Sequence, residues 1–138
     1  MTYLVDANVL SEPTRPTPCA QVVEWLRRHQ AVLAASPIVL GELEYGILLL
    51  PRGRRRERLE RWFKGGVQRL RVLDFDASCA AAWARLLARL KSEGHAMPIK
   101  DSLIAATALA GGMSVATRNT RDFLHAGVPV ENPFHVEA

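Results

Sequence analysis

The segment Thr2-Tyr-Leu-Val-Asp-Ala-Asn8 opens the chain with a short apolar run that ends in a carboxylate. Residues 2–5 predict a buried β-strand, and Asp6 follows at its carboxyl end. Further along the chain, strand-like segments alternate with segments of helical periodicity. This alternation predicts an α/β sandwich with a mostly parallel sheet of four to five strands. The other expected strands are 31–35, 71–75, 114–117 and 128–131, and the expected helices are 19–30, 37–50, 53–70, 77–92 and 98–110.

Local signals mark several of these helix boundaries. Ser36 followed by Pro37 is typical of an N-cap and a first helical residue. Pro51 is expected to stop the helix that starts there, and the pair Gly65-Gly66 to loosen the next one.

Length and composition indicate one ordinary globular domain over residues 1–138. Of its residues, 49% are apolar and 23% are charged, and the net charge is +4. No apolar run approaches the roughly 20 residues of a membrane span, and the start of the chain has no signal-peptide pattern. A cytoplasmic protein without membrane association is expected. Cys19 and Cys79 lack metal spacing and are expected to be small buried thiols.

Four acidic residues lie within or next to apolar segments of the sequence: Asp6, Glu42, Asp101 and Asp122. All four follow predicted strands or lie on helices that leave them, where parallel sheets gather their ligands. Burying four carboxylates together is prohibitive without a cation. Oxygen ligands alone indicate Mg²⁺ or Mn²⁺. The histidines form no metal-binding pair and argue against zinc; they are His29, His95, His125 and His135.

Each acid also has a structural interpretation. Asp6, Asp101 and Asp122 each precede or begin a helical segment and would serve as caps, with Asp122 leading to Gly127. Asn8 would support Asp6 by a hydrogen bond. Glu42 interrupts an apolar helical stripe, which favours a metal-facing role over a paired buried one, whereas Glu44 points the opposite way. The stripe consists of Ile38, Val39, Tyr45, Gly46 and Leu49.

The positive charge is concentrated in one segment. Residues 52–71 contain nine Lys or Arg and two Glu, a local charge of +7, so the rest of the chain carries −3. A basic segment together with an acidic metal site suits a polyanionic substrate. The alternative is a solvated helix face balanced by Glu57 and Glu60. Nucleotide-binding glycine loops and a serine-hydrolase elbow are both missing from the sequence.

Five motifs in order give the chain a close resemblance to the PIN-domain nucleases, and among them to toxins of the VapC/FitB type. The matching stretches are Leu4-Val-Asp-Ala-Asn-Val-Leu-Ser-Glu12, Gly41-Glu-Leu-Glu-Tyr-Gly-Ile47, Leu50-Pro-Arg-Gly-Arg-Arg55, Asp101-Ser-Leu-Ile-Ala-Ala-Thr-Ala108 and Thr117-Arg-Asn-Thr-Arg-Asp-Phe123, with Gly127-Val and Asn132-Pro-Phe near the end.

The resemblance implies a PIN-like α/β/α sandwich and a Mg²⁺- or Mn²⁺-dependent endoribonuclease that acts as the toxin of a type II toxin–antitoxin pair. It makes Asp6, Glu42, Asp101 and Asp122 the catalytic, metal-binding acids, with Asn8, Thr117 and Asn119 in support. It also implies a homodimer, silenced by a cognate antitoxin whose own DNA-binding half contacts operator DNA. The candidates for contact with the RNA backbone are Arg52, Arg54, Arg55 and Arg56.

Two other functions remain open from the residues. A phospho-acceptor enzyme would use Asp6 after the first strand, but haloacid-dehalogenase phosphatases need a second Asp where this chain has Asn8. A non-catalytic binding module would use structural acids and act through complexes with antitoxin and operator DNA. The run Ile47-Leu-Leu-Leu50 spans more than one helix face, so part of it is expected to meet a partner or a second subunit.

Overall fold

A five-stranded parallel sheet forms the centre of the computed structural model, which describes residues 1–134. The strands are β1 (Tyr3–Val5), β2 (Leu33–Ala35), β3 (Arg71–Val72), β4 (Ser114–Ala116) and β5 (Val130–Glu131), in the order β3-β2-β1-β4-β5. Tyr3 of β1 pairs with Leu33 on one side and with Ser114 on the other. The expected α/β class with a parallel sheet is therefore confirmed. His135 lies outside the described residues.

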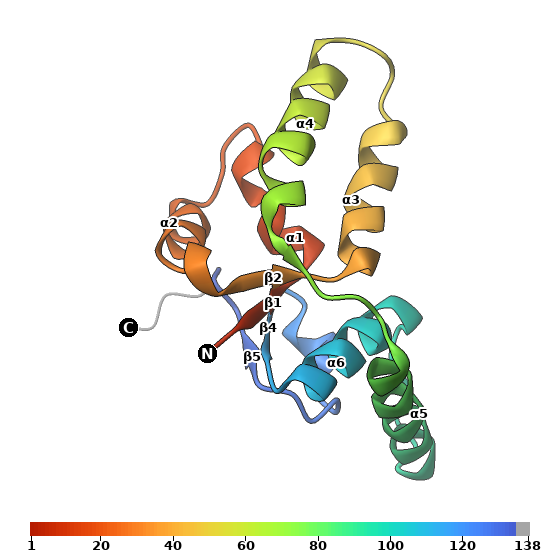
Figure 1. Cartoon of the computed structure of the whole chain (residues 1–138). Coiled ribbons are helices and arrows are strands. Elements are labelled where there is room, and N and C mark those ends of the chain that lie inside the picture. The colour runs from red at the N-terminus through yellow and green to blue at the C-terminus, as the bar shows by residue number, and fades with distance from the viewer. Residues whose placement is uncertain (135–138) are drawn as a thin grey trace.

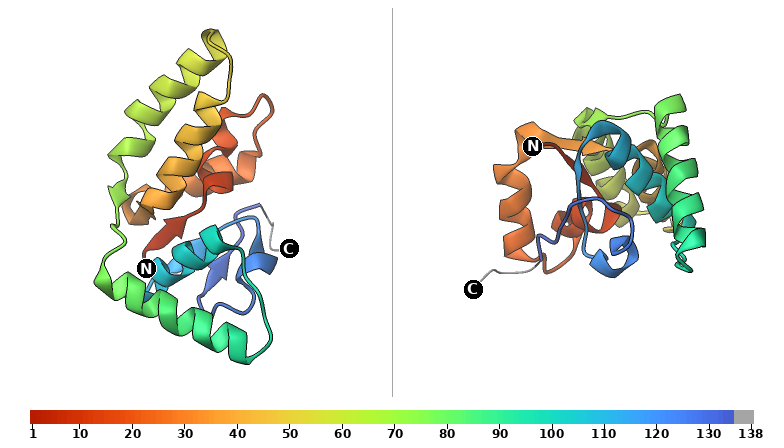
Figure 2. Two further views of the ribbon diagram at one scale, coloured as in Figure 1. Left: turned by 90° about the vertical axis from the view of Figure 1, so that its right-hand side faces the viewer. Right: turned by 90° about the horizontal axis from the view of Figure 1, so that it is seen from below.

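Helices cover both faces of the sheet. They are α1 (Ala7–Leu10), α2 (Ala20–Arg28), α3 (Pro37–Leu48), α4 (Arg54–Gly65), α5 (Ala77–Ser92) and α6 (Ile99–Gly111), with 3₁₀ turns η1 (Glu12–Thr14), η2 (Gln30–Val32), η3 (Val67–Arg69) and η4 (Thr120–Phe123). The first four helices lie on one side, with α3 and α4 rising as a hairpin, and α5 and α6 lie on the other (Figures 1 and 2). This is the expected three-layer sandwich.

The strand order places a topological switch between β1 and β4. The chain runs outward from β1 to β2 and β3, then returns through α5 and α6 to β4 on the opposite side of β1. In such sheets the loops that leave the two switch strands diverge and open a crevice at their carboxyl ends. Val5 and Ala116 end the two switch strands and are fully buried. The segments that follow them, from Asp6 and from Thr117, lie side by side at this edge of the sheet and are joined by hydrogen bonds.

The core fills the space between the sheet and the two helical layers. Its centre consists of side chains with no exposed surface, which include Leu4, Val9, Val22, Val39, Ile104 and Val115. At the end of α6, Gly112 adopts a left-handed conformation with φ of 63°, which favours glycine and stops the helix as the sequence predicts.

Several boundaries differ from the sequence expectations. Ala31 and Val32 belong to the turn η2, so β2 begins at Leu33. The expected strand 71–75 keeps only Arg71 and Val72, both exposed at the sheet edge. The charged helix was expected to continue to residue 70 with a weak point at Gly65-Gly66. It ends at Gly65, and a separate 3₁₀ turn follows.

Other features of the described residues agree with expectation. Helix α5 spans Ala77–Ser92 as predicted, and Ser36 caps α3. Cys79 is buried, whereas Cys19 is only half-buried. Within residues 1–134, none of the helices has the length and apolar character that crossing a membrane would require.

Candidate functional site

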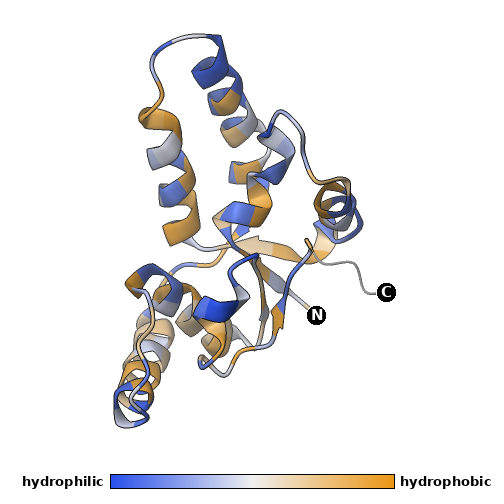
Figure 3. Cartoon of the chain, turned by 180° about the vertical axis from the view of Figure 1, so that it is seen from behind, coloured by the Kyte–Doolittle hydropathy of each residue, from blue (hydrophilic) through white to orange (hydrophobic). Residues whose placement is uncertain are grey.

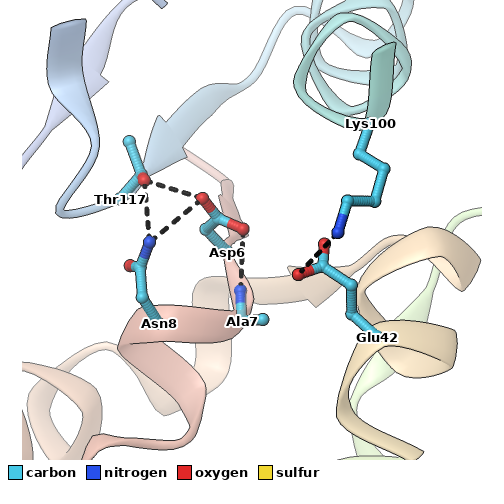
Figure 4. A network of polar contacts seen from close by, with 6 residues as sticks. All are labelled: Asp6, Ala7, Asn8, Glu42, Lys100 and Thr117. Atoms are coloured by element: carbon cyan, nitrogen blue, oxygen red, sulfur yellow. Dashed lines mark hydrogen bonds and ion pairs between the residues drawn. The ribbon is translucent and has the colours of Figure 1, made fainter. Parts of the chain in front are cut away.

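Asp6 lies at the carboxyl end of β1 with only 4% of its surface exposed. Its Oδ1 accepts a hydrogen bond of 2.8 Å from the Ala7 backbone N–H, so Asp6 is the N-cap of α1, as its structural interpretation predicted. Its Oδ2 accepts a bond of 2.7 Å from the Thr117 hydroxyl (Figure 4). The carboxylate is therefore held rigidly at the switch point between β1 and β4.

The supporting residues form a network around this carboxylate. Asn8 Nδ2 donates to Asp6 Oδ2 at 3.3 Å, and Asn8 Oδ1 accepts the Arg118 backbone N–H at 3.0 Å. Thr117 is completely buried, and its hydroxyl also accepts the Asn119 backbone N–H at 3.0 Å. Asn8 and Thr117 thus hold Asp6 as expected, whereas the exposed Asn119 joins the network through its backbone.

Glu42 projects from α3, with 30% of its side chain exposed. The buried face of α3 consists of Val39, Leu43 and Ile47, so the stripe that Glu42 was expected to interrupt shares only Val39 with the core face. Tyr45 is 65% exposed on this helix. Glu42 lies at the edge of the core, and its carboxylate points toward α6 (Figure 4).

Asp101 occupies the first turn of α6 and is the carboxylate on which the other three act. Its pKa is raised to about 6, chiefly by partial burial and then by the negative charges of Asp6, Asp122 and Glu42, in that order. A hydrogen bond with Asp122 makes the smallest contribution to this pKa. The four acids are therefore close enough for their charges to interact, which is the convergence that the sequence predicted.

Asp122 lies in the exposed turn η4 after β4. Asn119 occupies the cap position of this turn, so the expected capping role of Asp122 is wrong. The turn packs against α6, which brings Asp122 to the side of Asp101.

The chemistry of this donor set fits a hard divalent cation. All the donors are oxygens, and the raised pKa of Asp101 reports an excess of negative charge that a cation would neutralise. Within residues 1–134, however, no three acidic, histidine or cysteine side chains are already arranged as a metal-binding group. Side-chain rotation of Glu42 or Asp122, both partly or fully exposed, would be needed to bring ligands around one ion.

Lys100 is a member of the site that the sequence analysis missed. Its Nζ lies 3.6 Å from Glu42 Oε2, across the gap between α6 and α3. In the sequence, Lys100 directly precedes Asp101, and this is the signal that could have placed a cation near the acids. Its pairing with Glu42 could not be predicted, because it depends on the tertiary structure.

The four arginine candidates for RNA contact, at the start of the basic segment, do not lie beside the acids as the sequence suggested. The connection from Pro51 to Gly53 is at the far end of the α3–α4 hairpin from the sheet (Figure 1). From Glu42 to the end of α3 at Leu48 is already roughly 9 Å along the helix axis. Arg56 donates to Glu60 Oε1 at 2.8 Å, whereas the three other candidates are exposed: Arg52, Arg54 and Arg55.

Comparison with known families gives a match to the PIN domain over residues 3–128. The chain is similar to the plasmid stability protein StbB of Pseudomonas syringae pv. tomato, with 42% identity over 95% of this chain and 97% of that protein. It is 38% identical to the toxin FitB of Neisseria gonorrhoeae, over 96% of this chain and 98% of that one.

Two further similarities concern an activity and an assembly. The VapC ribonuclease Y4jK of Sinorhizobium fredii is 36% identical, over 95% of this chain and 96% of its own length. A chain in the structure of FitAB bound to an IR36 DNA fragment has a TM-score of 0.92 at 37% identity, with 99% of each chain covered.

Proposed function

The chain belongs to the PIN-domain family, and from this membership and its acidic crevice we propose that it is a metal-dependent endoribonuclease, the toxin of a type II toxin–antitoxin pair. The observation that carries the proposal is the mutual interaction of the four acids at the switch point of the sheet. A ribonuclease and a toxin among the relatives, each similar over nearly its whole length, support the activity.

Asp6, Glu42, Asp101 and Asp122 are the proposed ligands of Mg²⁺ or Mn²⁺, directly or through water. When bound, such an ion activates water and relieves charge on the phosphoryl oxygens. Thr117 and Asn8 fix the orientation of the Asp6 carboxylate, so its oxygens are positioned before substrate arrives. The partly buried Asp101 has to lose its proton before it can bind a cation, and its pKa of about 6 allows this at neutral pH.

RNA is proposed to approach the open side of the crevice, with its backbone extending along the α3–α4 hairpin. Arg52, Arg54 and Arg55 are exposed at the far end of that hairpin, where they would contact phosphates remote from the cleaved bond. Arg56 is the least available of the four candidates, because it pairs with Glu60 and also donates to the Leu50 carbonyl at 3.3 Å.

A cognate antitoxin is the proposed partner, and operator DNA would be contacted through that antitoxin. Solved structures similar to this chain include FitAB and a VapBC2 complex, each bound to DNA. A homodimer is part of the same proposal. The alternative of a binding module without catalysis makes the same partner prediction but no prediction of cleavage, so only an activity measurement separates the two.

The test is RNA cleavage by the purified chain in Mn²⁺, compared with its Asp6→Asn variant. We expect cleavage to fall at least about 100-fold, because the variant loses a ligand charge while keeping the side-chain shape. The melting temperature should change by only a few degrees, because the amide oxygen keeps one of the two bonds, from Thr117 or from Ala7, and the relieved repulsion with Asp101 offsets the loss of the other.

The matched control is Glu44→Gln, which removes one carboxylate from the exposed face of the same helix that carries Glu42. It should cleave RNA at nearly the wild-type rate. Wild-type cleavage by Asp6→Asn, or equal cleavage by the wild type in Mn²⁺ and in EDTA, would contradict the catalytic assignment.

A further inference from the structure

One basic side chain contacts the group of four acids. Lys100 extends from the first turn of α6 toward Glu42 on α3, and the two charged groups are 3.6 Å apart (Figure 4). Among residues 1–134, Lys100 is the only basic residue with an ion pair of 4.0 Å or less to any of the four acids. Arg52, Arg54 and Arg55 differ from it in this respect, because they lie at the end of the α3–α4 hairpin that is far from the sheet.

The local sequence does not favour a lysine at this position. Lys100 is the second residue of α6, where the positive end of the helix dipole disfavours a cation. Its side chain is 64% exposed, so packing does not fix it either. The Glu42 carboxylate, 3.6 Å from the ammonium group, supplies the attraction that directs this side chain toward α3.

We propose that Lys100 is an internal counter-cation of the acidic crevice, which a divalent ion has to displace from Glu42. The inference rests on the proposed metal site. A Glu42 oxygen engaged with the ammonium group has less negative potential to offer a second cation, and the two cations repel each other. Lys100 thus stabilises the acids before metal binds and weakens metal binding, which makes it a positioning residue that sets the metal concentration the protein requires.

Two effects of opposite sign follow from this role, and a merely structural lysine would give only the first. In EDTA, Lys100→Met should melt at a lower temperature than the wild type, because the acids lose their counter-charge. The same variant should bind Mn²⁺ more tightly, by about two- to fivefold, which is the range expected from a partly exposed ion pair.

The experiment measures the free Mn²⁺ signal by electron paramagnetic resonance at increasing protein concentration. Lys91→Met is the matched control, since Lys91 is an exposed lysine on α5 that faces none of the four acids. Lys100→Arg keeps the positive charge. We expect tighter Mn²⁺ binding in Lys100→Met alone, with Lys91→Met and Lys100→Arg close to the wild type.

The outcomes separate this inference from the proposed function. Equal Mn²⁺ affinity in the wild type, Lys100→Met and Lys91→Met would overturn the role of Lys100 and leave the metal site standing. Weaker binding in Lys100→Met would also overturn it. An absence of Mn²⁺ binding in both the wild type and Lys100→Met would overturn the metal site, and the inference with it.

Discussion

At the scale of one residue, Asp101 shows that grouping the four acids lowers the stability of the folded chain. Its carboxyl group is partly buried beside three other acids, and its pKa rises from 3.8 to about 6. A raised pKa means that the folded protein disfavours the charged form of this side chain. Ionised Asp101 is therefore a source of instability, which a bound cation would relieve.

The variant Asp101→Asn should accordingly be more stable than the wild type at pH 8 in EDTA, by about 1–2 kcal/mol. A shift of two pKa units corresponds to at most about 3 kcal/mol, and partial exposure reduces it. The sign follows from linkage: well below pH 3.8 Asp101 is protonated in both folded and unfolded chains, so the difference vanishes there. It grows as the pH rises from about 4 and is complete above about 6.

Urea unfolding between pH 4 and pH 8 measures this difference. Asp74→Asn, at an exposed aspartate outside the crevice, is the control and should track the wild type at each pH. A stability gain in Asp101→Asn that stayed constant over this range would show that ionisation of Asp101 is not its cause.

Sequence reasoning picked out four acids whose charges interact in the folded chain, because strand ends are recognisable in one dimension. Asp6 follows an apolar run, and parallel strands place such residues along one edge. It missed the Lys100–Glu42 pair because that contact depends on how α6 packs relative to α3. It also misjudged the surroundings of Glu42, since an apolar stripe on a helix does not say which of its residues the neighbours cover.

Among the helices, α3 has the clearest local specification and the most direct connection to the site, since it carries Glu42. Ser36 is 1% exposed at its start, and its hydroxyl accepts the Ile38 backbone N–H at 3.0 Å. Pro37 then supplies a first residue with no N–H to satisfy. These two residues predicted the start of the helix, and the structure confirms it.

Ser36→Ala should destabilise the protein by about 1 kcal/mol, because the capping acceptor is lost from a buried helix start. Urea unfolding would measure this loss of unfolding free energy, and the dependence of that free energy on urea concentration should be unchanged. Ser92→Ala, at the exposed last turn of α5, makes the same substitution without removing an N-cap and should be nearly neutral. Similar losses in both variants would contradict the capping argument.

The short strands show that the local sequence predicts the presence of a strand but not its length. β3 keeps two exposed residues of the five expected, because only Arg71 and Val72 pair with the edge of β2. Leu73 still donates its N–H to the Ala35 carbonyl at 3.0 Å, but the chain then turns toward α5. Apolar content predicted the segment, whereas pairing with a neighbour decided its length.

At the scale of the whole molecule, the α3–α4 hairpin presents an apolar surface that no element within residues 1–134 covers. Tyr45 and Leu49 are 65% and 66% exposed, and Leu48 is 56% exposed, while Ile47 is buried. In Figure 3 the far end of α3 is hydrophobic and the start of α4 is hydrophilic. The expected division of the Ile47–Leu50 run between core and surface is confirmed, and exposed patches of this kind mark contact surfaces.

The proposed occupant of this surface is the cognate antitoxin. The group of four acids, whose Glu42 lies roughly 9 Å along α3 from Leu48, is also a favourable site for a guanidinium or ammonium group from the same partner. Antitoxin and Mn²⁺ would then compete for the four acids, so the affinity of the complex should fall as Mn²⁺ is added.

Leu48→Glu tests the apolar part of this partner surface. The side chain is exposed, so the variant should fold and keep its melting temperature within a few degrees. A carboxylate placed in an apolar interface should weaken binding of the small protein encoded by the neighbouring open reading frame by at least about tenfold, measured by calorimetry. Val23→Glu, at an exposed valine of α2, is the control and should bind normally. Unchanged antitoxin binding and self-association in Leu48→Glu, together with an affinity that Mn²⁺ does not alter, would show that the partner docks elsewhere.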